Sequence, residues 1–379
     1  MIYLDNAATT FPKPAQVYRA ASGVMERLGA NPGRSGHRMS LAAGRVVMRC
    51  RDALAALLNV DAPERIVFCL NCTDALNMAI RGLPLSGGHV IAMALDHNAS
   101  LRPLCGMAAR GEIELDVLTP GPDGAVSRAQ VERALRPDTR LVAMSHASNV
   151  TGALQPAAEI GALCREKGVL FLLDAAQTLG VEPVHPEALC ADLLAFPGHK
   201  GLLGPMGTGG LWLREGLTLS PYREGGTGSR SESPLQPDDL PDRYESGTLN
   251  LPGVAGLLAG ARFVAAHGEE IREKEAALTR RLRAGLTAMP SVTLYGPEAP
   301  SVGIVSFNLA GRRSGDVADQ LNRLGIGVRA GLHCAPLAHR ALGTLETGVV
   351  RASPGFFNTE GDIDRLLSAV WRISLEPEF

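Results

Sequence analysis

The segment VLFLLDAAQTLGVEPVHPEALCADLLAFPGHKGLLGP (residues 169–205) contains two apolar stretches, 169–174 and 193–196, that decide the fold. Both stretches are continuously apolar rather than alternating, which is typical of strands buried on both faces of a sheet. Asp174 ends the first stretch, and Lys200 follows the second by four residues. We therefore expect two buried strands that bring a carboxylate and an amine to one edge of a sheet.

Five further apolar stretches flank this segment and alternate with helical patterns. They cover residues 65–70, 89–95, 114–119, 140–147 and 208–214, with a helix expected from about Asp74. Strands separated by helices indicate crossover connections and a mostly parallel sheet. The sequence therefore predicts an α/β fold with seven strands in its larger part.

The rest of the chain predicts a loop, a long helix and a second unit. Residues 217–241 are rich in Gly, Ser, Pro and charge, and we expect them to form a long functional loop. A helical pattern follows over about 254–289. The last hundred or so residues predict a smaller α/β unit, with strands near 302–309 and 327–329.

Composition narrows the class of protein. The 379 residues suffice for two domains, and 37 basic against 39 acidic side chains give a net charge of -2. Such a balance offers no electrostatic surface for nucleic acid or an anionic membrane. No apolar run approaches the roughly 20 residues of a membrane span, and the start MIYLDNAATTF lacks the pattern of a secretory signal. Seven irregularly spaced cysteines favour a reducing cytosol over a disulfide framework.

Polar residues recur where the predicted strands end. The residues concerned are Thr73, His97, Asn149, Asp174 and Lys200. In parallel α/β sheets, ligands bind outside the carboxyl ends of the strands. We therefore predict a ligand site at this edge.

Lys200 and Asp174 each have a structural and a functional interpretation. Most lysines are surface residues, but Lys200 follows a wholly apolar strand among glycines, and a lysine in a dry pocket has the free amine that Schiff-base chemistry needs. A buried Asp174 needs a cationic partner, and a protonated pyridine nitrogen is one. A helix N-cap explains Asp174 equally well when it is taken alone.

Three other motifs carry weaker signals. Residues 71–74 (NCTD) join a strand to a helix, where free N–H groups and the Thr73 hydroxyl favour a phosphate. Cys69-x-x-Cys72 resembles a metal or redox pair, but Cys69 is expected in a strand core and no second pair exists, so we expect no metal. The glycine-rich stretches 204–210 and 225–228 match neither a dinucleotide fingerprint nor a Walker loop.

Cys334 is the candidate nucleophile. A lone cysteine is usually a small buried hydrophobic residue, but residues 329–336 (RAGLHCAP) suggest a partly exposed loop. Arg329 and His333 could favour the thiolate there, which is the nucleophilic form.

Ten motifs, in order along nearly the whole chain, resemble the cysteine desulfurase and selenocysteine lyase branch of the class V, fold-type I pyridoxal-phosphate (PLP) enzymes. They are YLDNAATT (3–10), NPGRSGHRMS (31–40), NCTDALN (71–77), DHNAS (96–100), SHASNVTG (145–152), LLDAAQ (172–177), FPGHKGLLGP (196–205), YESGTLN (244–250), VRAGLHCAP (328–336) and VVRASPGFFNT (349–359). The resemblance implies a large PLP-binding domain over 14–252 and a small domain formed by 1–13 and 253–379.

The resemblance also implies roles for individual residues. Lys200 would hold PLP as a Schiff base and move protons, His97 would stack on the ring as an acid or base, and Asp174 would pair with the ring nitrogen. Gln177 and Asn149 would lie at the phenolic oxygen of PLP, and its phosphate would be met by Thr73, Cys72 and His199 together with Thr248 of a partner subunit. Arg351 would bind the substrate carboxylate, and Cys334 would take the sulfur as a persulfide. Asn6 and His37 match positions near the substrate. These roles imply a homodimeric desulfurase that converts L-cysteine to L-alanine and passes sulfur to an acceptor protein.

One residue departs from the family pattern. Pro197 stands where the family usually has Ser or Thr, and it lacks both a hydroxyl and an N–H for the phosphate.

Other functions are compatible with the same motifs. The substrate could instead be L-selenocysteine, or the reaction that of another class V β-lyase, epimerase or aminotransferase. A non-catalytic sulfur carrier with the same fold is the alternative from a different class, and the combination of Lys200, Asp174, His97 and Arg351 argues against it.

Overall fold

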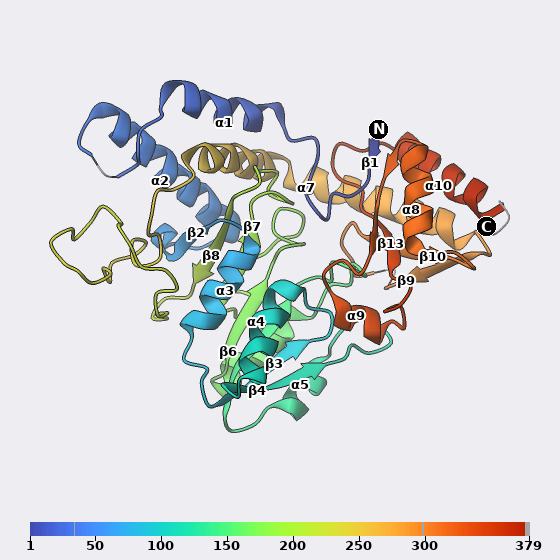
Figure 1. The fold of residues 1–379 in the computed structure, drawn as a ribbon, viewed down its shortest axis with the longest axis horizontal. Coiled ribbons are helices and arrows are strands. Elements are labelled where there is room, and N and C mark those ends of the chain that lie inside the picture. The colour runs from blue at the N-terminus through green and yellow to red at the C-terminus, as the bar shows by residue number, and fades with distance from the viewer. Residues whose placement is uncertain (34, 298, 376–379) are drawn as a thin grey trace.

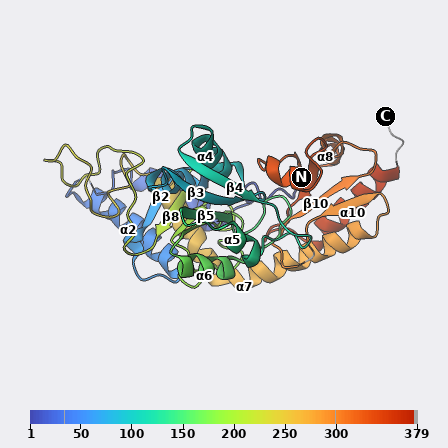
Figure 2. The same cartoon turned by 90° about the horizontal axis from the view of Figure 1, so that it is seen from below.

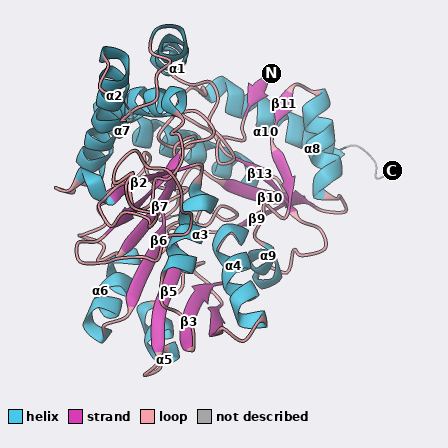
Figure 3. Cartoon of the chain, turned by 60° about the vertical axis from the view of Figure 1, so that its left-hand side comes forward, coloured by secondary structure: helices cyan, strands magenta, loops and turns pink. Residues whose placement is uncertain are grey.

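The computed structural model describes residues 1–33, 35–297 and 299–375, so Arg34 of the 31–40 motif lies outside the described residues. A large sheet and a smaller sheet form separate groups of strands, each with its own helices (Figures 1 and 3). Within the described residues, no helix is both long and apolar enough to cross a membrane.

The large sheet has the seven predicted strands. They are β2 (Ile66–Cys69), β3 (Gly88–Met93), β4 (Ile113–Leu118), β5 (Thr139–Ser145), β6 (Leu170–Asp174), β7 (Leu193–Pro197) and β8 (Gly209–Leu213). Their order is β2-β8-β7-β6-β5-β3-β4. Of these seven strands, only β8 runs in the opposite direction to the other six. The prediction of a mostly parallel α/β sheet is confirmed, and each strand lies within two residues of its predicted start.

Helices cover both faces of this sheet because its strands are apolar on both faces. The helices are α1 (Ala15–Arg27), α2 (Arg38–Leu58), α3 (Cys72–Gly82), α4 (Asn98–Ala109), α5 (Arg128–Ala134), α6 (Ala157–Lys167) and α7 (Leu251–Thr287). In β2, Ile66 and Phe68 pack with α2, α6 and α7, whereas Val67 and Cys69 pack with α3 and α4. Alternate residues of one strand thus enter opposite cores, which makes a three-layer structure.

The smaller part contains more strands than the sequence predicted. Its four-stranded sheet has the order β12-β13-β10-β9, with β9 (Val292–Tyr295), β10 (Val305–Leu309), β12 (Arg329–Gly331) and β13 (Val349–Ala352). The single strand predicted near 327–329 is in fact two strands, because β11 (Ile326–Gly327) pairs with β1 (Ile2–Tyr3) and β12 pairs with β13. The helices α8 (Ser314–Arg323), α9 (Pro336–Ala341) and α10 (Glu360–Leu375) accompany these strands.

The two ends of α7 pack in two different hydrophobic cores. Its first turns pack against the large sheet through Leu251 and Leu257, and its later turns pack against the smaller sheet through Leu278 and Leu282. Figure 2 shows α7 running beneath both parts. Leu4 packs in the second core, with residues that are far from it in the sequence. The division of the chain at 252/253 stays a prediction, and α7 crosses that boundary.

A buried ion pair holds the end of the long loop. No helix or strand forms between β8 and α7, all of which lies within the described residues. Arg51 of α2 binds Glu245 through two contacts of 2.8 and 2.7 Å, and Glu245 also accepts the Phe68 N–H at 2.6 Å. The Arg51 guanidinium lies 4.5 Å from the centre of the Phe68 ring. This buried pair ties the YESGTLN motif to α2 and β2.

Replacing Glu245 with Ala should lower the free energy of unfolding by about 3–5 kcal/mol, because the Arg51 charge would stay buried without its partner. The matched control is Asp364→Ala, which breaks the exposed pair with Arg281 (2.7 Å) and should change stability far less. Urea unfolding followed by circular dichroism measures both. Similar losses in the two variants would contradict the assignment.

Candidate active site

The carboxyl ends of the parallel strands open onto one cavity of about 200 Å³. Most of the predicted site residues line it: Cys72, Thr73, His97, Asn149, Asp174, Gln177, His199, Lys200 and Arg351. Four predicted residues are not among the described residues lining it, namely Asn6, His37, Thr248 and Cys334. Pro197 and Arg329 line the cavity as well.

Asp174 and Lys200 both line this cavity, and the charge of each affects the pKa of the other. Asp174 ends β6, where burial raises the pKa of its carboxyl while the Ala176 N–H and the Lys200 charge lower it. No helix begins at Asp174, so the N-cap interpretation is wrong. Burial lowers the pKa of Lys200, and the Asp174 charge opposes that shift. A lysine with a lowered pKa supplies the free amine more readily at neutral pH.

The turn that carries Lys200 is held by the N-terminal segment. The backbone oxygen of His199 accepts hydrogen bonds from the hydroxyl groups of Thr9 and Thr10 and, at 2.6 Å, from the Lys13 amine. The Lys13 pKa is lowered to about 8 by burial. Residues distant in sequence thus fix the lysine turn.

His97 is a neutral base at the start of α4. Its Nδ1 accepts the Ala99 N–H at 3.0 Å, which assigns the remaining proton to Nε2. Burial, followed by the charges of Lys200 and Arg329, lowers the His97 pKa to about 4. One ring nitrogen therefore caps the helix, and the other remains for a ligand.

The first turn of α3 forms the end of the cavity suited to an anion. Asn71 caps this helix by accepting the Asp74 N–H at 2.9 Å, and the helix begins at Cys72, two residues before the predicted start. Backbone N–H groups at a helix start attract a phosphate. His199 lines the same cavity, and burial lowers its pKa to about 4.

Three buried polar atoms in the cavity wall have no hydrogen-bond partner within the described residues: Asn149 Oδ1, His199 Nδ1 and Arg351 Nε. Buried polar atoms are nearly always satisfied. The wall of the cavity is thus built for a polar ligand with both donors and acceptors.

Two arginines from the smaller sheet complete the wall. Arg351 is only 1% exposed; it donates to the Asn149 carbonyl and to Asp5, each at 2.8 Å. Arg329 stands directly opposite Arg351 in the antiparallel β12–β13 pair. No motif marks Asp5 as a site residue or Arg329 as part of the cavity wall, because only the strand pairing brings Arg329 beside Arg351.

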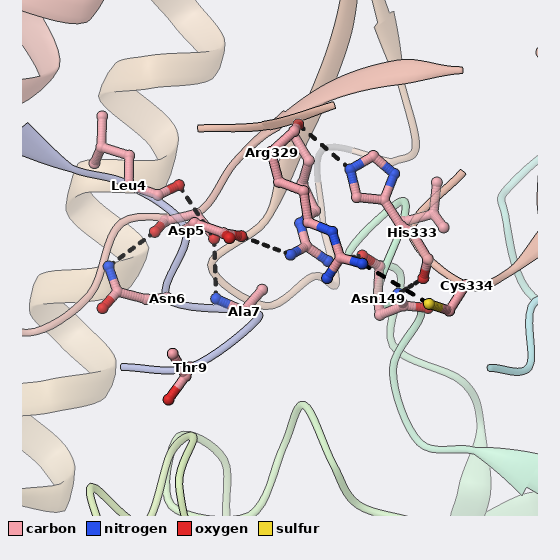
Figure 4. A network of polar contacts seen from close by, with 12 residues as sticks. Leu4, Asp5, Asn6, Ala7, Thr9, Asn149, Arg329, His333 and Cys334 are labelled. Atoms are coloured by element: carbon pink, nitrogen blue, oxygen red, sulfur yellow. Dashed lines mark hydrogen bonds and ion pairs between the residues drawn. The ribbon is translucent and has the colours of Figure 1, made fainter. Parts of the chain in front are cut away.

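Cys334 lies on an exposed loop outside the cavity wall. Its Sγ is 3.8 Å from Arg329 Nη2 (Figure 4), and its carbonyl accepts the Asn98 N–H at 2.7 Å. His333 and Cys334 both have left-handed φ values, 51° and 58°. Burial lowers the His333 pKa to about 3, so this histidine is neutral. His333 therefore brings no positive charge to the Cys334 sulfur at neutral pH, and of the two residues expected to favour the thiolate only Arg329 does so.

The other predicted residues have structural partners. Gln177 donates to the Ala7 carbonyl at 3.2 Å, and Asn149 donates to the His333 carbonyl at 2.7 Å. Asn6 is buried among backbone partners and lines a neighbouring cavity of about 40 Å³. The exposed His37 caps α2, and Thr248 accepts a 3.4 Å contact from Asn31.

Cysteine chemistry with a metal finds no support in the geometry. Within the described ranges, no group of three or more His, Cys, Asp or Glu side chains could hold an ion. Cys69 is buried in β2, 6% exposed, and all seven cysteines are free thiols.

Comparison with known proteins places this arrangement in a family. A model of the aminotransferase class-V family matches residues 2–366. A probable cysteine desulfurase of Methanothermobacter thermautotrophicus is 36% identical over 96% of this chain and 92% of its own, and a cysteine desulfurase of Escherichia coli O139:H28 is 34% identical over 98% and 93%. The apo structure of a cysteine desulfurase from Thermococcus onnurineus NA1 superposes with a TM-score of 0.92 at 32% identity, covering 98% of this chain and 94% of that one. Because the family model covers nearly the whole chain and full-length relatives are 34–36% identical, the chain belongs to the aminotransferase class-V family.

Proposed function

We propose that this protein is a PLP-dependent cysteine desulfurase that converts L-cysteine to L-alanine and holds the sulfur as a persulfide on Cys334. The observation that carries the proposal is that Arg329 both lines the cavity and contacts the exposed Cys334 sulfur at 3.8 Å. The Arg329 side chain thereby connects the proposed substrate cavity to the proposed nucleophile, Cys334. Relatives over nearly the full chain are named cysteine desulfurases.

The residues of the cavity fit PLP. Lys200 would hold it through its amine, Asp174 would pair with the ring nitrogen, and Gln177 would face the phenolic oxygen. The α3 N-terminus with Thr73, and the unpartnered His199 Nδ1, would bind the phosphate. When bound, PLP supplies an electron sink for negative charge at the substrate Cα.

The two arginines would place the substrate. Arg351 is a buried cation whose Nε has no hydrogen-bond partner among the described residues, which suits a substrate carboxylate. Asp5 already neutralises part of this charge at 2.8 Å and sets the orientation of the guanidinium. The lowered pKa of Lys200 makes its amine available to take the Cα proton.

Sulfur transfer requires the Cys334 loop to reach the cavity. The Cys334 thiolate attacks the substrate sulfur, so that an S–S bond forms and the Cβ–S bond breaks with its electron pair left on carbon. Protonation of that carbon, together with return of a proton to Cα, gives alanine, and His97 and the protonated Lys200 amine lie in the cavity to move these protons. A thiol reductant or an acceptor protein then removes the sulfur from the persulfide.

We also propose a homodimer in which Thr248 enters the cavity of a second copy. Thr248 lies on the long loop and is not among the described residues lining its own chain's cavity. The proposed contact with the phosphate therefore requires another chain. The acceptor protein would approach the exposed Cys334 side of the smaller sheet.

Replacing Cys334 with Ala should reduce sulfide release from L-cysteine by about 10³-fold or more, because the nucleophile is lost. Sulfide and alanine are measured with a thiol reductant present. Cys105→Ala is the control, since Cys105 is another exposed thiol, and it should keep full activity. Retained desulfuration in Cys334→Ala would contradict the assigned role, and retained turnover of selenocysteine alone would identify the lyase reaction.

Borohydride reduction of the protein with PLP should leave the cofactor covalently on Lys200, since the free amine there is favoured. Peptide mass spectrometry locates the modification. Lys13→Ala should keep it on Lys200, whereas Lys200→Ala should abolish it. A protein that stays colourless with PLP and gains no mass would refute the proposed function.

Replacing Pro197 with Ser should tighten PLP binding by about 2- to 10-fold, because a hydroxyl and an N–H are added at the cavity wall. Titration of the apoprotein with PLP, followed by absorbance, gives the dissociation constants. Pro197→Ala adds the N–H but no hydroxyl and separates the two contributions. Equal constants in all three proteins would contradict a phosphate contact at this position.

A further inference from the structure

The thiol of Cys72 contacts the carboxylate on which the site is built. Cys72 is the first residue of α3, and its Sγ lies 3.3 Å from Oδ1 of Asp174. Both side chains are buried, 8% and 5% exposed, and both line the cavity. The contact joins residues 102 positions apart, the start of one helix and the end of a central strand.

The protonation of the pair fixes the direction of this hydrogen bond. Burial and the nearby Asp174 charge raise the pKa of Cys72 well above its usual range, so the sulfur keeps its proton. A thiol next to a carboxylate can then only donate. Cys72 is thus an S–H donor to Asp174, not a candidate nucleophile.

Both donors to Asp174 converge on the same oxygen. Oδ1 accepts the Cys72 thiol and also the Ala176 N–H at 2.8 Å. No hydrogen bond to Oδ2 occurs within the part of the chain that the structure describes. The carboxylate is therefore held by one oxygen, while the other remains free on a residue that lines the cavity.

We propose that Cys72 is a positioning residue whose thiol holds Oδ1 of Asp174 so that Oδ2 is presented to the ring nitrogen of the cofactor. This inference rests on the proposed function, since it assumes that PLP occupies the cavity. A thiol is a weak donor, so it fixes the carboxylate while withdrawing little of the negative charge that attracts the ring nitrogen. Cys72 itself need not touch the cofactor.

Cys69, the last residue of β2, provides the matched control three residues before Cys72. It is equally buried, at 6% exposed, but its Sγ lies 3.8 Å from the Val67 carbonyl oxygen and packs with α3. Removing either sulfur leaves a similar small void. Only the removal of the Cys72 sulfur takes a donor from Asp174.

The test compares PLP binding in four proteins: wild type, Cys72→Ala, Cys72→Ser and Cys69→Ala. The dissociation constant is measured by titrating the apoproteins with PLP, and the visible absorbance band is recorded at saturation. Cys72→Ala should bind PLP about 2- to 10-fold more weakly, the usual value of one hydrogen bond, and its band should shift. Cys72→Ser keeps a donor and should restore both readouts, and Cys69→Ala should match wild type.

Three outcomes would overturn the inference. The first is a Cys72→Ala protein with the dissociation constant and band of the wild type. The second is an equal loss in Cys69→Ala, and the third is a loss that Cys72→Ser does not restore, since either would mean general loosening of the strand end. If wild type itself fails to bind PLP, the proposed function fails instead, and the two failures are thereby distinguished.

Discussion

The arrangement of the cavity depends on the buried carboxylate of Asp174. A buried carboxylate is stable only with donors and a nearby cation. The fold provides the Ala176 N–H, the Cys72 thiol and the Lys200 amine, which come from three different segments. Because β6 lies at the centre of the sheet, with β5 and β7 on either side, these partners can reach the end of β6 from neighbouring elements.

The opposite wall of the cavity comes from the smaller sheet and carries positive charge. Arg351 and Arg329 lie side by side because β12 and β13 pair in that register. Asp5 on the N-terminal segment offsets Arg351, and the same segment holds the Lys200 turn through His199. The first residues of the chain therefore connect the two halves of the site, because they contact Arg351 of the smaller sheet and the Lys200 turn of the large sheet.

The Cys334 sulfur and the cavity are kept apart in this structure. Cys334 lies outside the wall, while the carbonyl of its neighbour His333 is held by Asn149 and its own carbonyl by Asn98. Two successive left-handed residues give this loop its shape. An exposed sulfur suits delivery to an acceptor, and the Arg329 contact keeps it beside the place where the substrate would lie.

The sequence by itself determined the large sheet and the gathering of polar residues at its edge, because buried strands are continuously apolar and parallel strands end at one edge. It missed β1, β9 and β13, which are short or pair across long distances, so that no local pattern marks them. It also pointed to His333 as a residue that could favour the Cys334 thiolate, although burial keeps that ring neutral. Only the tertiary structure decided which groups touch: the Cys72 thiol on Asp174, Arg329 beside Cys334, and Asp5 on Arg351. These contacts join residues from 5 to 346 positions apart, and their existence depends on strand register and packing, which a linear pattern does not contain.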